Sequence, residues 1–367
     1  MVINELLRVA MERDASDLHL IVASPPMLRI YNKLVPIGEV PLTPKAVQDV
    51  FEAITSDRQR ETFYRELDLD CAYSVPGLGR FRVNAALQRG SFALTIRCLP
   101  SEIPTIDKLR LPEICKSLVL KRRGLIVVTG PPSSGKSTTQ AAMIDYLNEQ
   151  ESRKVVTVED PIEFLHSHKK CLIVQRDIED DTKSFSSAVR HALRQNADVI
   201  LIGEMRDVNT IKAALAAAET GHLVLGTAHT LGAAETIERL INEFPSPQQE
   251  QARMQLTVVL EAVLSQLLLP RADGTGRVAL FEIMVATYAI RNLIRDKKFH
   301  QIPAMIEMGR QHGMQTFRQA VKDLVSNGII NPEEMLLRTS RWEELETTLS
   351  SQSPIGERTY SGFAGAR

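Results

Sequence analysis

The sequence predicts an α/β protein in which a larger domain with a parallel sheet follows a smaller α+β domain. From residue 124 onward, short apolar runs alternate with helical patterns, which is typical of a parallel sheet covered by helices. The 367 residues are 44% apolar, which is enough for two modest cores. Between one predicted strand and the next helix lies a turn with two glycines, at residues 130–137, where a ligand is expected.

Charge and hydropathy exclude several classes of protein. The 44 Lys and Arg nearly balance the 45 Asp and Glu, so no overall basic field indicates a nucleic-acid or lipid partner. Acidic residues interrupt the first twenty positions, which argues against a secretory signal. The longest apolar stretch, residues 256–270, contains Glu261, Ser265 and Gln266 and is too short to span a bilayer. We therefore expect no transmembrane segment.

The cysteines form no CxxC pair and have no zinc-like spacing to the histidines. They are expected to be reduced core thiols of a cytoplasmic protein. The four positions are Cys71, Cys98, Cys115 and Cys171.

The first domain is predicted over residues 1–98. Apolar residues at helical spacing in 3–13 and 44–54 indicate helices, and alternating runs around and after them indicate strands. Residues 99–112 are rich in proline and are predicted to link the domains.

The second domain is predicted over residues 113–350. Its expected strands carry the strings LIVVTG, KVVTVED, DVILIGE and HLVLGTAHT, with helices between them. The part from about residue 288 to 350 is expected to be helical. Residues 351–367 are rich in Gly and Ser and are expected to be disordered.

Residues 130–137, GPPSSGKS, fit the pattern GxxxxGK[ST] and lie between a predicted strand and a predicted helix. Backbone N–H groups of such a loop surround a phosphate, and the helix N-terminus adds its dipole. Lys136 is expected to reach the β and γ phosphates, and Ser137 to bind Mg²⁺. The loop thus predicts a nucleoside triphosphate site. Its other expected contacts are Gly130, Pro131, Pro132, Ser133, Ser134, Gly135 and Thr138.

Acidic residues follow two of the predicted strands, at the sheet edge where ligands bind in open α/β folds. Glu204 is expected to act on the Mg²⁺ ion, partly through water, or on the attacking water. Glu159 and Asp160 end the other strand, and Glu163 follows one turn later. Either Glu163 or Glu204 could be the carboxylate that activates the water.

Four strings resemble the motifs of the type II/IV secretion ATPases: GPPSSGKSTT, VVTVEDPIEF, LRQNADVILIGEMRD and TGHLVLGTAHT. Within this family of hexameric motors, SDLHL, GRFRVNAALQRG, ETIERLINEFP and AIRNLIRD resemble the pilus-retraction branch. The likeness extends over nearly the whole chain. It implies a PAS-like N-terminal domain and a RecA-like ATPase domain, with ATP bound between them and near the neighbouring subunit.

The resemblance also implies roles for individual residues. Glu204 would be the Walker B acid and Glu163 the catalytic glutamate, while residues alone leave His222 and His229 open between packing and function. By resemblance, these two histidines sense the γ-phosphate. Arginines of the first domain, Arg82 and Arg97, would move onto the nucleotide, as arginines from another domain or chain often do in P-loop enzymes.

The implied protein is a homohexamer that powers pilus retraction and twitching motility. It would be cytoplasmic, at the inner face of the cell membrane, and docked on an inner-membrane platform protein, with a paralogous retraction ATPase as a further partner. No nucleic-acid partner is expected. The alternatives are an accessory ring ATPase of low turnover, a pilus-assembly or secretion ATPase, and a DNA translocase.

Two details of the sequence bear on these alternatives. Pro132 and Ser133 stand where the family usually has Thr and Gly, and Ser133 disfavours a positive φ, which would alter affinity or slow turnover. The string AIRNLIRD predicts an amphipathic helix with Arg291 and Arg295 on one edge. That edge is either simply solvated or part of a segment that couples ring motion to retraction.

Overall fold

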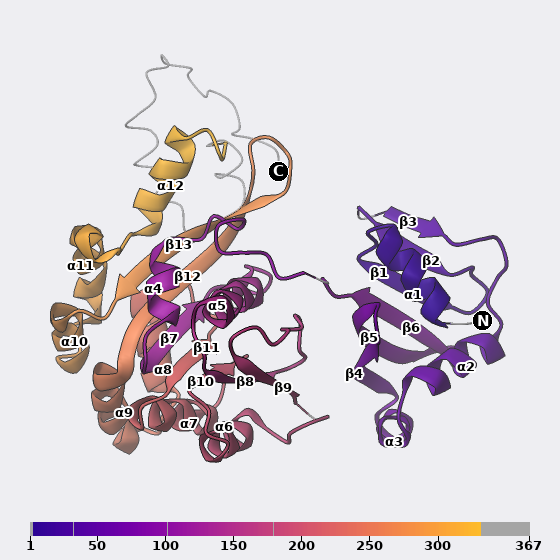
Figure 1. Cartoon of the computed structure of the whole chain (residues 1–367), viewed down its shortest axis with the longest axis horizontal. Helices are drawn as coiled ribbons and strands as arrows, with labels where there is room; N and C mark the ends of the chain where they lie inside the picture. The colour runs from indigo at the N-terminus through magenta and orange to yellow at the C-terminus, as the bar shows by residue number, and fades with distance from the viewer. Residues whose placement is uncertain (1–2, 32, 101, 179, 332–367) are drawn as a thin grey trace, which may run out of the picture.

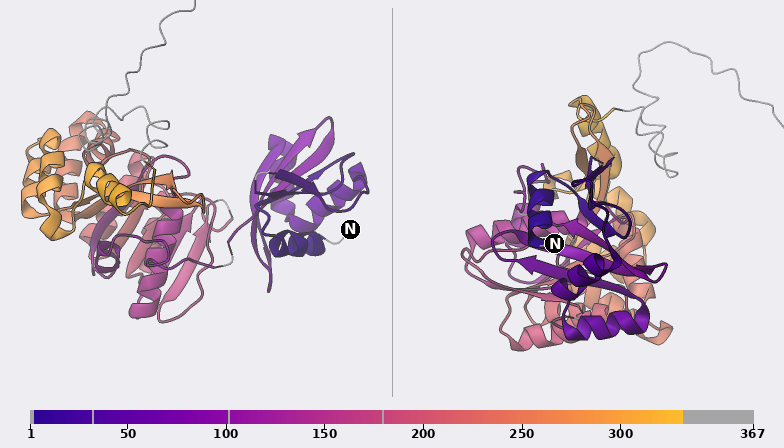
Figure 2. Two further views of the ribbon diagram at one scale, coloured as in Figure 1. Left: turned by 90° about the horizontal axis from the view of Figure 1, so that it is seen from above. Right: turned by 90° about the vertical axis from the view of Figure 1, so that its right-hand side faces the viewer.

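The computed structural model describes residues 3–31, 33–100, 102–178 and 180–331. Two domains, each built on its own sheet, lie side by side and are joined by an extended connection (Figure 1). The left view of Figure 2 shows the same separation from above, whereas in the right view the N-terminal domain lies in front of the second domain.

The N-terminal domain is a six-stranded antiparallel sheet with helices on one face (Figure 1). The strand order is β3-β2-β1-β6-β5-β4. Its strands are β1 (Asp17–Ile21), β2 (Met27–Ile30), β3 (Lys33–Pro36), β4 (Asp68–Val75), β5 (Gly79–Gln88) and β6 (Ser91–Cys98), and its helices are α1 (Ile3–Glu12), α2 (Pro44–Ile54) and α3 (Asp57–Glu66).

Alternation along the strands gives this sheet one buried face and one charged face. Phe81 and Val83 of β5 are fully buried, together with Phe51 and Phe63 of the helices, whose rings lie 4.7 Å apart between centroids. The residues between them on β5 point the other way, because successive side chains of a strand alternate. The charged face therefore carries arginines that the domain's own core does not use.

The second domain contains a seven-stranded sheet in the order β13-β12-β7-β11-β10-β8-β9. Only β13 runs antiparallel to its neighbour. The strands are β7 (Gly124–Thr129), β8 (Lys154–Glu159), β9 (Leu172–Asp177), β10 (Val199–Ile202), β11 (Leu223–Thr227), β12 (Leu260–Pro270) and β13 (Arg277–Val285). The accompanying helices are α4 (Ile114–Val119), α5 (Lys136–Gln150), α6 (Phe185–Arg194), α7 (Val208–Glu219), α8 (Ala233–Asn242) and α9 (Ser246–Val259).

The four strands expected in this domain are confirmed as β7, β8, β10 and β11, and the predicted parallel pairing is present. The apolar stretch at residues 256–270 spans the end of α9 and the whole of β12. Within the ranges that the structure describes, no helix combines the length and apolar character needed to cross a membrane.

Residues 99, 100 and 102–113 connect the domains and form no helix or strand; residue 101 is not described. The second half of this connection packs on the second domain, because Ile106 and Leu111 are buried in the same cluster as Ile126 of β7. The predicted boundaries at residues 98 and 113 stay predictions, although packing joins the chain from Ile106 onward to the second domain.

Short helices follow the sheet: α10 (Tyr288–Arg295), the 3-10 turns η1 (Phe299–Gln301) and η2 (Arg310–His312), α11 (Ile302–Met308) and α12 (Phe317–Ser326). They agree with the helical character expected from about residue 288. The rest of the predicted helical part, residues 332–350, and the predicted disordered tail, 351–367, lie outside the described residues.

Arg291 of α10 ties this helix to the junction of α9 and β12. Its guanidinium donates to the carbonyl oxygens of Ala286, Thr257 and Val258, at 2.9, 2.5 and 2.8 Å, and pairs with Glu261 at 3.2 Å. The interpretation of both arginines as one solvated edge is therefore wrong for Arg291. These contacts hold α10 in place, and they do not test the hypothesis that this segment couples ring motion to pilus retraction.

The cysteines are free thiols, as predicted. Burial raises the pKa of Cys71 and Cys115 to about 12, and that of Cys98 to about 11. Burial also raises the pKa of Cys171. These thiols are therefore poor nucleophiles near neutral pH.

Ile294 is fully buried on the inner face of α10, whereas Arg295 beside it is half exposed. Ile294→Ala should lower the free energy of unfolding by about 2–5 kcal/mol, because it removes buried methyl groups and leaves a cavity. Chemical denaturation of the purified chain measures this. Arg295→Ala is the matched control and should change stability little. Equal losses in the two variants would contradict this packing of α10.

Candidate nucleotide site

The loop between β7 and α5 requires glycine at both ends. Gly130 has φ +143°, and a Cβ there would lie 2.2 Å from the carbonyl oxygen of Gln266 in β12. Gly135 has φ +88°, and a Cβ there would lie 2.9 Å from the side-chain nitrogen of the same Gln266. Having no side chain, Gly135 cannot cap α5, so the first N–H groups of this helix are available to an anion.

Lys136 is folded back over the loop. Its Nζ donates to the carbonyl oxygens of Gly130 and Pro131, at 2.8 and 3.0 Å. Burial lowers the pKa of this ammonium, while the carboxylates of Glu204 and Glu163 act in the opposite direction. The amine is thus held at the loop that the sequence assigned to phosphate binding, with two carboxylates of the site acting on it.

The tip of the loop contains the two residues by which it departs from the family pattern. Pro132 and Ser133 are both exposed, and Ser133 has φ +61°. The sequence indicated that a serine disfavours such a conformation, and the structure places it there. The hydroxyl of the next residue, Ser134, is buried without a hydrogen-bond partner.

A small cavity of about 80 Å³ lies beside the start of α5 and collects the acidic residues expected from the sequence. Its walls come from α5, from the chain after β8 and from the chain after β10. The parallel strands bring these segments to one edge of the sheet. The expected residues that line it are Ser137, Glu159, Asp160, Glu163 and Glu204.

Glu204 is held at the end of β10 by bonds to both neighbouring strands. The N–H of Gly203 donates to Val158 of β8 at 2.8 Å, and the hydroxyl of Thr227 of β11 donates to the carbonyl of Gly203. The Glu204 carboxylate contacts His229 Nε2 and Arg206 Nε. His229 thereby reaches the acidic cavity through Glu204.

His222 lies at the opposite end of β11. Its carbonyl accepts from the N–H of Gly124, the first residue of β7, whereas the phosphate loop follows the last residue of that strand. The imidazole Nδ1 lies 3.0 Å from the carbonyl oxygen of Ala217. A whole strand therefore separates His222 from His229 within one chain, and the expectation that His222 senses the γ-phosphate stays a prediction.

Arg82 and Arg97 lie opposite each other on the charged face of the N-terminal sheet. Arg97 pairs with Asp17 at 3.0 Å, and Arg82 lies 3.8 Å from Asp70, so both have partners within their own domain. The structure does not bring them to the phosphate loop. A role at the nucleotide stays a prediction that requires domain motion or a neighbouring subunit.

Glu159 is turned into the sheet edge rather than toward solvent. Its carboxylate accepts from Thr157 Oγ1 at 2.7 Å and from Gln175 Nε2 at 3.4 Å. Burial raises the pKa of Glu159 to about 7, although these hydrogen bonds act to lower it.

The cavity wall also holds Gln140 and His166, whose Nε2 and Nδ1 atoms, respectively, are buried without hydrogen-bond partners. Burial lowers the pKa of His166 to about 4.

The sequence analysis did not assign Gln266 to the site. Besides approaching both loop glycines, its Oε1 accepts from the hydroxyl of Thr139 at 2.8 Å. Neighbouring Ser265 accepts from the N–H of Gly232 at 2.9 Å. A signal was present, because these two polar residues interrupt an apolar stretch and are fully buried, which requires hydrogen-bond partners.

A larger pocket of about 410 Å³ also adjoins the start of α5. It is lined by residues 108–111 of the connection, by Thr138, by residues of β12 and β13 that include Arg277, and by Arg271 in the turn between these two strands. Its mixed apolar and basic lining suits the nucleoside part of a nucleotide whose phosphates lie on the loop.

Comparisons with known proteins identify the family of this chain. Residues 106–338 match the family described as type II/IV secretion system protein, so the chain belongs to that family. Type IV pilus retraction ATPase PilT of Pseudomonas aeruginosa is 46% identical over 90% of this chain and 96% of its own length. Type IV pilus ATPase PilU of the same organism is 38% identical, over 93% and 91%.

The crystal structure of the pilus retraction motor PilT with bound ADP superposes with a TM-score of 0.88. It is 43% identical in sequence, over 95% of this chain and 99% of that one. The predicted class, a P-loop ATPase with a RecA-like domain and a smaller N-terminal domain, is confirmed by these matches.

Glu159→Gln should make the nucleotide-free protein more stable at pH 8, by about 1–3 kcal/mol. Because the folded-state pKa of this acid is raised from 4.5 to about 7, wild-type folding loses stability as pH rises through that range. Gln keeps the acceptor and carries no charge. Urea unfolding at several pH values should show that the difference in unfolding free energy between this variant and the wild type narrows toward pH 5. Exposed Glu238→Gln should show no such trend. A difference that does not vary with pH would contradict this assignment.

Proposed function

We propose that this chain is the subunit of a homohexameric motor that hydrolyses ATP to retract type IV pili and so drives twitching motility. The observation that carries the proposal is the 46% identity with PilT over nearly the full length of both chains. The site residues that such a motor needs, Lys136, Glu163 and Glu204, lie at one end of the sheet and interact electrostatically.

In the proposed mechanism, the N–H groups of the loop and of the first turn of α5 receive the phosphates. Lys136 exchanges its bonds to Gly130 and Pro131 for bonds to phosphate oxygens. Glu163 accepts the proton of the attacking water at its carboxylate. Glu204 orients the water or the metal shell, and His229 holds the Glu204 carboxylate in place.

Mg²⁺ is proposed to bind through the hydroxyl of Ser137 and, by way of water, through Glu204. These oxygen donors are of the type that Mg²⁺ prefers, and it commonly relies on phosphate oxygens to complete its shell. This fits the described part of the chain, where no group of three His, Cys, Asp or Glu side chains could hold a metal by itself. When bound, the ion would neutralise charge that develops on the phosphates.

The proposal also includes the location of the ring in the cell. We infer that the ring acts in the cytoplasm at the inner face of the cell membrane, docked on the platform protein of the pilus machinery. A paralogous retraction ATPase is the further partner that we propose, since PilT and PilU of one organism both resemble this chain.

An accessory ring ATPase of low turnover is the second candidate. The observation in its favour is the strained Ser133, with φ +61°, at the tip of the phosphate loop. Steady-state phosphate release by the purified protein distinguishes the two candidates, because the accessory subunit would release little phosphate on its own.

Lys136→Ala should reduce phosphate release by a factor of at least about 100, because it removes the ammonium that meets the phosphates in the transition state. A deletion strain supplied with this variant should not retract pili, while the wild-type gene should restore retraction. Circular dichroism would establish that the variant folds. Phosphate release at the wild-type rate would show that the loop assignment is wrong.

Arg82→Ala and Arg97→Ala should each lower turnover by a factor of about 10³ if these arginines stabilise transition-state charge. ATP binding should persist, because the loop is untouched. Exposed Arg65→Ala of α3 is the control. If turnover is unchanged in both variants, the pairs with Asp70 and Asp17 are their whole role.

A further inference from the structure

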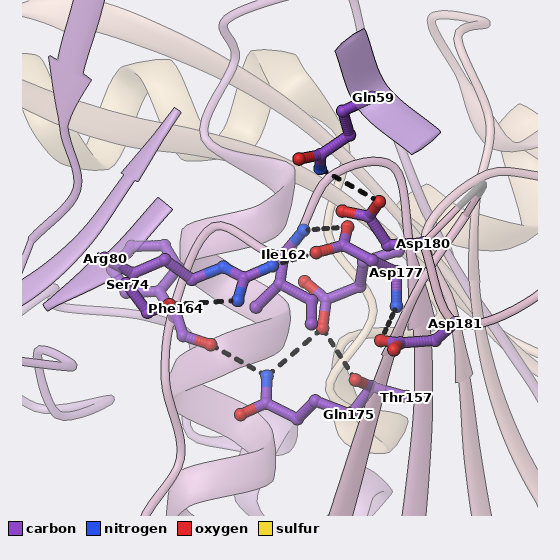
Figure 3. Close-up of polar contacts among 11 residues, drawn as sticks. Gln59, Ser74, Arg80, Thr157, Ile162, Phe164, Gln175, Asp177, Asp180 and Asp181 are labelled. Atoms are coloured by element: carbon purple, nitrogen blue, oxygen red, sulfur yellow. Dashed lines mark hydrogen bonds and ion pairs between the residues drawn. The ribbon is translucent and has the colours of Figure 1, made fainter. Parts of the chain in front are cut away.

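A third arginine of the N-terminal domain reaches the ATPase domain. Arg80 of β5 forms an ion pair with Asp177, the last residue of β9 (Figure 3). Both side chains are largely shielded from water, with 17% and 4% of their surfaces exposed. Such a pair is screened far less than a surface pair, so it is sensitive to the placement of the two domains.

A second contact joins the domains close by. Gln59 of α3 donates from Nε2 to Asp180 Oδ1 at 3.2 Å (Figure 3). Asp181 accepts from the backbone N–H of Asp177 at 2.9 Å. The N-terminal domain therefore contacts the last residue of β9 and the chain just after it.

Asp177 also holds the loop that carries Glu163. While one of its oxygens pairs with Arg80, the other, Oδ1, accepts from the backbone N–H of Ile162 at 3.0 Å (Figure 3). Ile162 immediately precedes Glu163. One carboxylate thus connects the N-terminal domain to the residue next to the proposed catalytic glutamate.

The other side of Glu163 is fixed to the same strand. Gln175 of β9 donates to the carbonyl oxygen of Phe164 at 2.8 Å and accepts from the N–H of His166 at 2.8 Å. The loop is therefore held to β9 before and after Glu163. A displacement of the end of β9 moves the anchor on one side only, which would rotate the glutamate relative to the phosphate loop.

Arg80 balances the charge at this anchor. Burial raises the pKa of Asp177, and the Arg80 guanidinium opposes that effect. Without the arginine, the carboxylate would be buried without its cation, a state that proteins relieve by rearrangement or by protonation. Either response would weaken the hold on Ile162.

We propose that Arg80 is a positioning residue for ATP hydrolysis: through Asp177, the docked N-terminal domain holds Glu163 where it can act on the attacking water. Hydrolysis then depends on where the N-terminal domain lies, and the domain need not contact the nucleotide to exert this control. The inference rests on the catalytic role proposed for Glu163.

Arg80→Ala should lower kcat for phosphate release by a factor of about 10 to 100, since small misplacements of catalytic groups have effects of that size. The affinity for ATP, measured directly with a fluorescent analogue, should be unchanged. Arg80→Lys should recover part of kcat. Arg89→Ala, in the exposed turn after β5, removes one positive charge from the same domain and should have no effect.

Asp177→Asn provides the second test, because the amide oxygen can still accept from Ile162 while the charge that attracts Arg80 is lost. It should lower kcat, and the double variant with Arg80→Ala should fall no further than the worse single variant. Additive losses, an unchanged kcat in Arg80→Ala, or a loss of ATP affinity in place of kcat would overturn the proposal. If Arg80→Ala does not fold, Asp177→Asn and Arg80→Lys decide it.

Glu163→Gln separates this proposal from the one on which it rests. If Glu163→Gln hydrolyses ATP normally, the catalytic role of Glu163 is wrong, whatever Arg80 does. If Glu163→Gln is inactive and Arg80→Ala is fully active, only the positioning role fails. Both assays use the purified full chain, so a failure to retract pili in cells would bear on the motor function alone.

Discussion

The close approach of the phosphate loop to β12 is the constraint on which the site depends. The Gln266 carbonyl leaves no room for a side chain at Gly130, and the Gln266 amide side chain approaches Gly135 and accepts from Thr139. Strand, loop and first helical turn are therefore fixed against one residue. Because Lys136 follows directly, its position, and that of the N–H groups around it, is set by packing before any anion arrives.

Much of the site could be predicted because the carboxyl ends of parallel strands meet at one edge. That rule placed Lys136, Glu163 and Glu204 together from local pattern alone. The same rule, applied to strand direction, puts His222 at the far edge, since it precedes its strand while His229 follows it. Arg80 could not have been found this way, because its contact depends on how the two domains are placed.

Two strands that the sequence did not reveal, β9 and β12, were missed for different physical reasons. β9 lies at the edge of the sheet and mixes apolar with polar residues, including Gln175 and Asp177, that serve the loop rather than the core. β12 follows α9 with no turn between them, so no break in the pattern marks its start at Leu260.

At the tip of the phosphate loop, Ser133 adopts a conformation that costs about 1–3 kcal/mol, while Pro132 offsets part of this cost by restricting the unfolded chain.

The buried, weakly acidic thiols have a practical consequence for following domain motion. Maleimide dyes react with thiolates, and Cys71, Cys98 and Cys115 carry almost none at neutral pH. A cysteine introduced on an exposed turn of each domain would therefore be labelled well ahead of the native ones. A chain that keeps its native cysteines can thus carry a donor and acceptor dye pair, and energy transfer between the dyes would measure whether the distance between the two domains changes during turnover.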